Sequence, residues 1–144
     1  MQDNQNIEAG NTDLFGNNEE DQKALYAFHV KKVRNKLLTV AAVIFFFDLL
    51  ALLIGDLLTP ETLAISAVVP AIIVGMAFLA LKEPILAVVI ASVIIIGIWI
   101  YVIVMTDITM AIQGWLAKIL VITMLLSAFQ NAKEARRIDK EFGL

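Results

Sequence analysis

The stretch Leu37–Leu58, LLTVAAVIFFFDLLALLIGDLL, decides the fold class of this chain. A helix needs about 20 predominantly apolar residues to cross a bilayer, and this stretch reaches that length. Asp48 breaks the pattern, because it lies in the middle of the stretch, where a carboxylate is costly. The stretch therefore predicts a membrane-spanning helix that carries one acid whose presence needs a reason.

The rest of the chain continues the apolar pattern. Of the 144 residues, 60% are hydrophobic, whereas a soluble domain averages about 45–50%. The excess lies in long runs after residue 36, and the segments between the runs leave no room for a separate catalytic domain. The sequence predicts an all-α polytopic membrane protein, an up-down bundle of four transmembrane helices with short loops.

Prolines and charged residues mark the ends of the spans. Thr59-Pro60-Glu61 and Lys82-Glu83-Pro84 are expected to form the first two turns, because proline ends one helix and suits the first turn of the next. The third turn is expected at residues 106–109. The transmembrane domain at residues 37–130 then has spans at about 37–58, 62–81, 85–105 and 110–130.

Polar segments flank this domain. Residues 1–22 are acidic and poor in apolar side chains, so we expect a disordered tail. Residues 23–36 combine apolar residues at helical spacing with basic neighbours, which is typical of an amphipathic helix lying on the membrane face. Residues 131–144 are expected to continue the fourth span as a charged cytoplasmic helical tail.

The basic residues predict the orientation. Of the 11 Lys and Arg residues, Lys118 falls within a span, and the other ten fall on one side of the bilayer. The opposite side carries Asp56, Glu61 and Asp107 and no basic residue. The positive-inside rule therefore places the N and C termini in the cytoplasm, and we expect a bacterial inner membrane.

Basic residues next to the first and fourth spans are expected to face lipid. Clusters of this kind attract anionic headgroups, although ordinary topology determinants have the same composition. The lipid bilayer is therefore one expected partner. The residues concerned are Lys31, Lys32, Arg34, Lys36, Arg136 and Arg137.

A polar centre is predicted inside the membrane. At 1.5 Å per residue, Asp48 lies about 16 Å and Lys118 about 18 Å from the cytoplasmic end of their spans, so the two can meet. Pro70 leaves the Ser66 carbonyl without its usual donor at a similar place in the second span. We expect Asp48, Lys118, Pro70 and Ser66 to form this centre.

Three interpretations of the acid and the base remain open. Asp48 can be a coupling acid that binds protons or cations, with Lys118 tuning its release. The two can instead form a static pair that determines helix register and partner choice. Lys118 can also extend towards the outer face and meet Asp56.

Small residues predict the faces along which helices pack. Small side chains let helices approach closely in lipid. On the first span they share the face of Asp48, and the second span has a similar row. The predicted packing residues are Ala41, Ala51, Gly55, Ala67, Ala71 and Gly75.

The composition excludes several kinds of site. The chain has no cysteine and one histidine, His29, so a His/Cys metal cluster or a Ser-His-Asp triad lacks its parts. No phosphate-binding loop, nucleotide fingerprint or nucleophile elbow is present. We expect no catalytic residue, metal or cofactor, no nucleic-acid partner and no enzyme activity.

Two functions follow from these features. The first is a subunit or accessory factor of a membrane complex, with a membrane-protein partner or a second copy of the chain. The second is a small proton- or cation-coupled transporter that uses Asp48. Four spans with one acid in the first resemble the small multidrug resistance transporters, and the resemblance implies that Asp48 is the proton and cation site of a dual-topology dimer. The one-sided charge argues against dual topology.

Overall fold

The structure is a computed structural model that describes residues 3–105 and 114–143. In these residues the regular elements are four helices: α1 (Asp3–Ile54), α2 (Pro60–Leu79), α3 (Pro84–Met105) and α5 (Trp115–Phe142). Each of them is long and apolar enough to cross a membrane. The described chain is therefore all-helical, with the composition of a multi-pass integral membrane protein.

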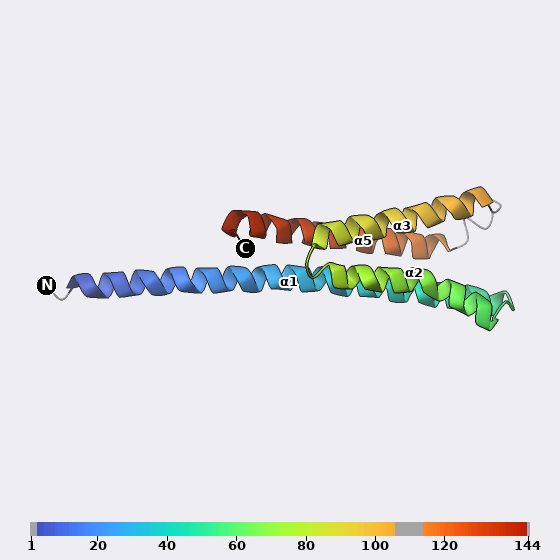
Figure 1. The fold of residues 1–144 in the computed structure, drawn as a ribbon, viewed down its shortest axis with the longest axis horizontal. Coiled ribbons are helices and arrows are strands. Elements are labelled where there is room, and N and C mark those ends of the chain that lie inside the picture. Colours follow the sequence, from blue (N-terminus) through green and yellow to red (C-terminus); the bar gives the residue numbers. More distant parts are fainter. Residues whose placement is uncertain (1–2, 106–113, 144) are drawn as a thin grey trace.

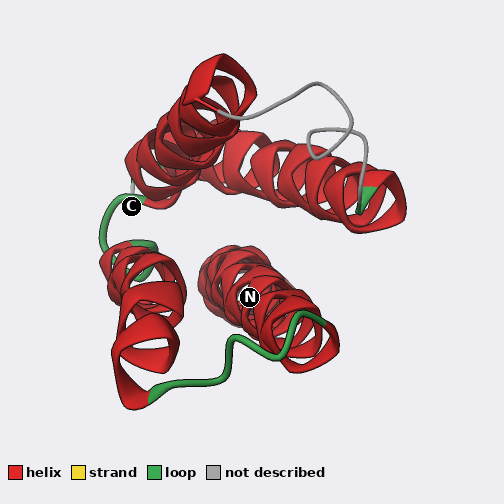
Figure 2. Ribbon diagram, turned by 90° about the vertical axis from the view of Figure 1, so that its right-hand side faces the viewer, coloured by secondary structure: helices red, strands yellow, loops and turns green. Residues whose placement is uncertain are grey.

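The helices form two pairs. α1 and α2 lie side by side, and α3 and α5 lie beside them as a second layer (Figure 1). Figure 2 shows the same two layers end-on. α1 makes the most extensive contacts of any helix, against both α5 and α2. Both ends of the chain lie towards the same end of the molecule (Figure 1).

The turn between α1 and α2 is built by polar residues. α1 ends at Ile54, four residues before the predicted end of the first span, because Asp56 adopts a left-handed conformation with φ 51°, which aspartate tolerates better than most residues. Thr59 and Thr62 then form a reciprocal capping box, with backbone-to-hydroxyl distances of 3.0 and 3.3 Å. Pro60 occupies the first turn of α2, as its fixed φ favours.

The turn between α2 and α3 is tighter. The backbone amides of Lys82 and Glu83 both donate to the carbonyl of Leu79 at 3.0 Å, and Pro84 follows as the first residue of α3. The third turn predicted at residues 106–109, the predicted start of the fourth span at Met110 and the predicted outer-side Asp107 lie outside the described residues.

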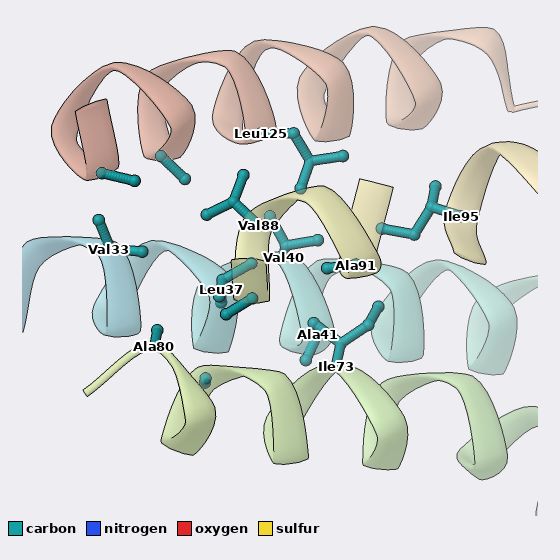
Figure 3. Packing of buried hydrophobic residues seen from close by; sticks show 14 of the residues in the cluster. Val33, Leu37, Val40, Ala41, Ile73, Ala80, Val88, Ala91, Ile95 and Leu125 are labelled. Atoms are coloured by element: carbon teal, nitrogen blue, oxygen red, sulfur yellow. The ribbon is translucent and has the colours of Figure 1, made fainter. Parts of the chain in front are cut away.

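The core lies towards the end of the bundle that carries the two termini. Leu37, Ile73, Ile95 and Val121 are among its largest fully buried side chains. Figure 3 shows side chains of all four helices meeting there. Much of the remaining apolar surface faces outward, as lipid-exposed helices require.

The contact between α1 and α5 has a regular pattern. Its buried positions recur at intervals of three and four residues, the spacing of left-handed helix packing. α1 contributes valine and leucine, whereas α5 contributes mainly alanine at the matching end, so large side chains pack against small ones. The buried residues are Val30, Val33, Leu37 and Val40 of α1 and Val121, Leu125, Ala128, Ala132, Ala135 and Ile138 of α5.

Residues 23–36 continue α1 directly into the first span. Val30 and Val33, which belong to the apolar stripe expected to face the membrane surface, are buried in this helix. They contribute to the interface with α5, so protein covers the stripe. Periodicity in a sequence shows that a face is apolar, but lipid and a neighbouring helix can both cover such a face.

Candidate functional site

Asp48 lies on α1, seven residues beyond Ala41, which is the last buried residue of that helix. α1 holds its side chain half-buried, next to Phe46 and Phe47, whose exposed rings meet edge to face at 5.9 Å. Among the described residues, the ion pairs are those of Arg137 with Glu134 and with Glu141, and no hydrogen bond involves the Asp48 carboxylate. The acid is thus a polar group within an apolar helix, without a partner in the described chain.

The other residues of the predicted polar centre lie on α2 and α5. The Ser66 hydroxyl donates to the Leu63 carbonyl at 3.0 Å, within its own helix. Pro70 is buried, and α2 continues through it. Lys118 is half-buried in α5 and takes part in an interaction of its own. The pairing of Asp48 with Lys118 stays a prediction.

The residues predicted to pack helices occupy two environments. Ala41 is buried in the core, and Ala67 is half-buried. The remaining four are exposed in the single chain, so they are available to lipid or to another protein. These exposed residues are Ala51, Gly55, Ala71 and Gly75.

A chain of polar contacts joins α1 to α5 within their interface. The Lys36 ammonium donates to the Ser127 hydroxyl. One turn further along α5, the Asn131 amide donates to the Ser127 carbonyl at 2.8 Å, and the Asn131 side-chain oxygen lies 3.3 Å from His29 Nδ1. His29 is half-buried at this contact. In the sequence, the only indication of these contacts is the spacing of four residues between Ser127 and Asn131, which places both on one side of a helix.

Tyr26 borders a polar hollow of about 350 Å³ at the same end of the bundle. Lys82 and Glu83 of the second turn line it, together with Arg136 and Asp139 of α5. Burial raises the pKa of the Tyr26 hydroxyl above its usual 10.0, and the nearby Asp139 and Glu83 carboxylates raise it further. The hollow thus brings together three segments that are distant in the sequence.

The predicted lipid-facing basic residues fall on two helices. Lys31 and Lys32 are exposed on α1, where Lys32 Nζ lies 5.5 Å from the centre of the Phe28 ring. Arg34 and Lys36 are half-buried. Arg136 and Arg137 are exposed on α5 and line a second hollow, beside the α3 N-terminus.

The fold and these positions define the class of protein as a small multi-pass membrane protein. Within residues 19–105 and 114–143, no three His, Asp or Glu side chains are placed to hold a metal ion. Comparison with protein-family models, with curated proteins and with solved structures gives no match. The function is therefore argued from the residues themselves.

Proposed function

We propose that the protein is a non-enzymatic subunit or accessory factor of a membrane complex. The observation that carries the proposal is the half-buried Asp48, for which the described chain supplies no ion pair and no hydrogen bond. A carboxylate in an apolar span is costly unless a partner group satisfies it. A helix of a neighbouring membrane protein, or of a second copy of the chain, can supply that group.

The surroundings of Asp48 support an approach by another helix. Ala51 lies one turn further along α1, Gly55 follows at the next turn, and both are exposed. Small residues allow close contact between helices in lipid, and interhelical hydrogen bonds add to such contacts. We therefore assign to the partner the side of α1 that carries Asp48 and Ala51, together with Gly55 directly after the helix.

The orientation proposed for this function places both termini in the cytoplasm of a bacterial cell, with the bundle crossing the inner membrane in an up-down arrangement. The basic residues at the terminal end of the molecule support this orientation. The turn at Thr59 lies at the opposite end, where Asp56 and Glu61 stand without basic neighbours in the sequence.

Co-purification tests the subunit proposal. The tagged wild-type protein, extracted from its native membrane in mild detergent, is expected to carry a partner in constant ratio, or to run as a homo-oligomer. Asp48→Leu should release the partner, whereas Glu61→Gln, at the exposed start of α2, should retain it. A wild-type protein that is monomeric and alone in every mild detergent would contradict the proposal.

The second candidate function is a proton- or cation-coupled transporter, and the same half-buried carboxylate supports it. An intramembrane acid without a partner in its own chain can take up and release a cation. Proteoliposomes that contain only this protein should then show a proton-coupled flux, and Asp48→Asn should abolish it. Equal flux in the wild type and the variant would remove this candidate.

A further inference from the structure

Four basic residues of α5 occupy one face of the helix. Lys133, Arg136, Arg137 and Lys140 follow at intervals of three, one and three residues, which places them on adjacent turns of the same side. Together with Ile85 of α3 and Phe129, they line a hollow of about 750 Å³. The one acid in its lining, Glu134, forms an ion pair with Arg137 at 2.8 Å. The hollow therefore keeps an excess of positive charge.

An apolar groove of about 330 Å³ lies between α3 and α5 next to this hollow. Val93, Ile96 and Trp99 line it from α3, and Leu126 and Phe129 line it from α5. Ser92, also in the lining, donates its hydroxyl to the Val88 carbonyl at 2.7 Å, within its own helix. The groove thus offers an apolar wall to its occupant.

The hollow and the groove lie next to each other along α5. Phe129 lines both of them. Along α5, Arg136 lies seven residues beyond Phe129, or about 10 Å at 1.5 Å per residue. The positive charges are therefore displaced along the helix axis from the apolar wall, in the direction of the molecule's terminal end (Figure 1).

We infer that this composite groove binds one anionic phospholipid. The phosphate lies among Lys133, Arg136 and Lys140, where charged donors form the strongest hydrogen bonds to phosphate oxygens. One acyl chain lies along the groove between α3 and α5. The order of charge and apolar surface along the groove matches the order of headgroup and acyl chain in a phospholipid. The inference uses the membrane class of the protein and does not depend on the proposed partner of Asp48.

Exposed basic residues on α1 allow a specific lipid site to be distinguished from general attraction to the membrane. Lys31 and Lys32 are also exposed, but they lie on α1 and line neither the hollow nor the groove. General attraction to an anionic surface depends on the number of basic residues near the membrane, on whichever helix they lie. Binding at a specific lipid site, in contrast, requires the basic residues of α5 and the open groove beside them.

Tryptophan fluorescence can test the site, because Trp99 lines the groove and the chain has one other tryptophan, Trp115. Trp115→Phe leaves Trp99 as the reporter. The full-length protein is placed in phosphatidylcholine vesicles with a small fraction of phosphatidylglycerol whose acyl chains are brominated. We expect stronger quenching than with the same fraction of brominated phosphatidylcholine.

Two pairs of variants separate a site from general attraction. Lys133→Gln/Arg136→Gln/Lys140→Gln should lose the excess quenching, whereas Lys23→Gln/Lys31→Gln/Lys32→Gln, with the same change in charge, should keep it. Val93→Phe should lose it by filling the groove, whereas Val68→Phe, equally on an exposed helix face of α2, should keep it. All these positions are exposed, and circular dichroism checks that each variant is folded.

The outcomes decide between the alternatives. The lipid site is supported if the excess quenching is lost in the α5 triple variant and in Val93→Phe but is kept in their two controls. Equal loss in both triple variants means general electrostatic attraction and overturns it, as does equal quenching by both lipids in the wild type. Inorganic phosphate at the headgroup concentration should leave the excess unchanged, because it cannot occupy the apolar groove. Displacement by phosphate would identify a phosphate site and overturn the lipid assignment.

Discussion

At the scale of single residues, Asp48 carries the main functional question. The sequence shows that Asp48 lies in an apolar span. It does not show whether the carboxylate is buried or which groups it contacts. The structure holds the side chain half-buried and records no ion pair or hydrogen bond for it among the described residues. A carboxylate in this condition costs stability in the single chain, and for this reason we propose that it serves a partner or a cation.

Asp48→Leu is expected to stabilise the isolated protein in detergent by on the order of 1 kcal/mol, because it removes a partly buried charge that has no partner. Thermal unfolding followed by circular dichroism measures the change. Glu61→Gln, at an exposed position, is the control and should shift stability by less than about 0.5 kcal/mol. A loss of stability that Lys118→Met recovers in the double variant would show instead that Asp48 and Lys118 are paired.

Tyr26 gives a second prediction at this scale. Burial, followed by the charges of Asp139 and Glu83, raises its pKa above 10.0. The folded state therefore holds the phenolic proton more tightly than the unfolded state, so this stabilisation is present at neutral pH and decreases as the pH rises above about 10. In a Tyr101→Phe background, Tyr26 is the remaining tyrosine, and its phenolate absorbance should appear later than that of a free tyrosine.

Asp139→Asn should lower the midpoint of that absorbance titration, because it removes one of the two negative charges near the hydroxyl. Asp21→Asn, at an exposed position outside the lining of the hollow, serves as the control. A Tyr26 titration that begins below that of free tyrosine would contradict the hollow described between α1, α5 and the second turn.

At the scale of elements, the contact of α1 with α5 is the most extensive between any two described helices. Valine and leucine of α1 pack against alanine of α5 at intervals of three and four residues. The Lys36–Ser127 and His29–Asn131 contacts lie along the same interface. Apolar packing and polar contacts together hold residues 29–40 of α1 against α5.

Ala132→Leu should destabilise the bundle by about 1–3 kcal/mol, because a larger side chain overfills a tightly packed interface. Ala132 is fully buried. Ala71→Leu is the matched control, since Ala71 is exposed in the single chain. Thermal unfolding in detergent compares the two variants. If Ala71→Leu were the more damaging, the row of small residues predicted on the second span would be a packing face after all.

At the scale of the whole molecule, the distribution of charge predicts one orientation in the membrane. The two turns described in the structure lie at opposite ends of α2. Glu61 lies next to the first turn, at the start of α2, and Lys82 lies in the second. The positive-inside rule assigns the second to the cytoplasm together with both termini.

Cysteine labelling measures this orientation directly, because the chain contains no cysteine of its own. In intact cells, a membrane-impermeant maleimide should label Glu61→Cys and leave Lys82→Cys unlabelled until the membrane is permeabilised. Both positions are exposed, so each thiol is accessible on its own side. The reverse pattern would invert the topology and move the α5 basic face to the outer leaflet.

The sequence by itself determined the class of the protein and the existence of its helices. Length and apolarity are local properties, and a chain in hydrocarbon satisfies its backbone hydrogen bonds by forming helices. Turn residues such as Pro60 and Pro84 likewise act locally, so they mark where α2 and α3 begin.

Only the tertiary structure decided which faces meet. The spans are apolar on all sides, and lipid is as apolar as leucine, so hydrophobic pattern alone cannot assign an inner face. The structure buries Val33 against α5, turns Ala71 and Gly75 outward and joins the basic face of α5 to a groove on α3. Each of these results depends on contacts between residues far apart in the chain, because neighbouring helices, rather than local sequence, determine what covers an apolar face.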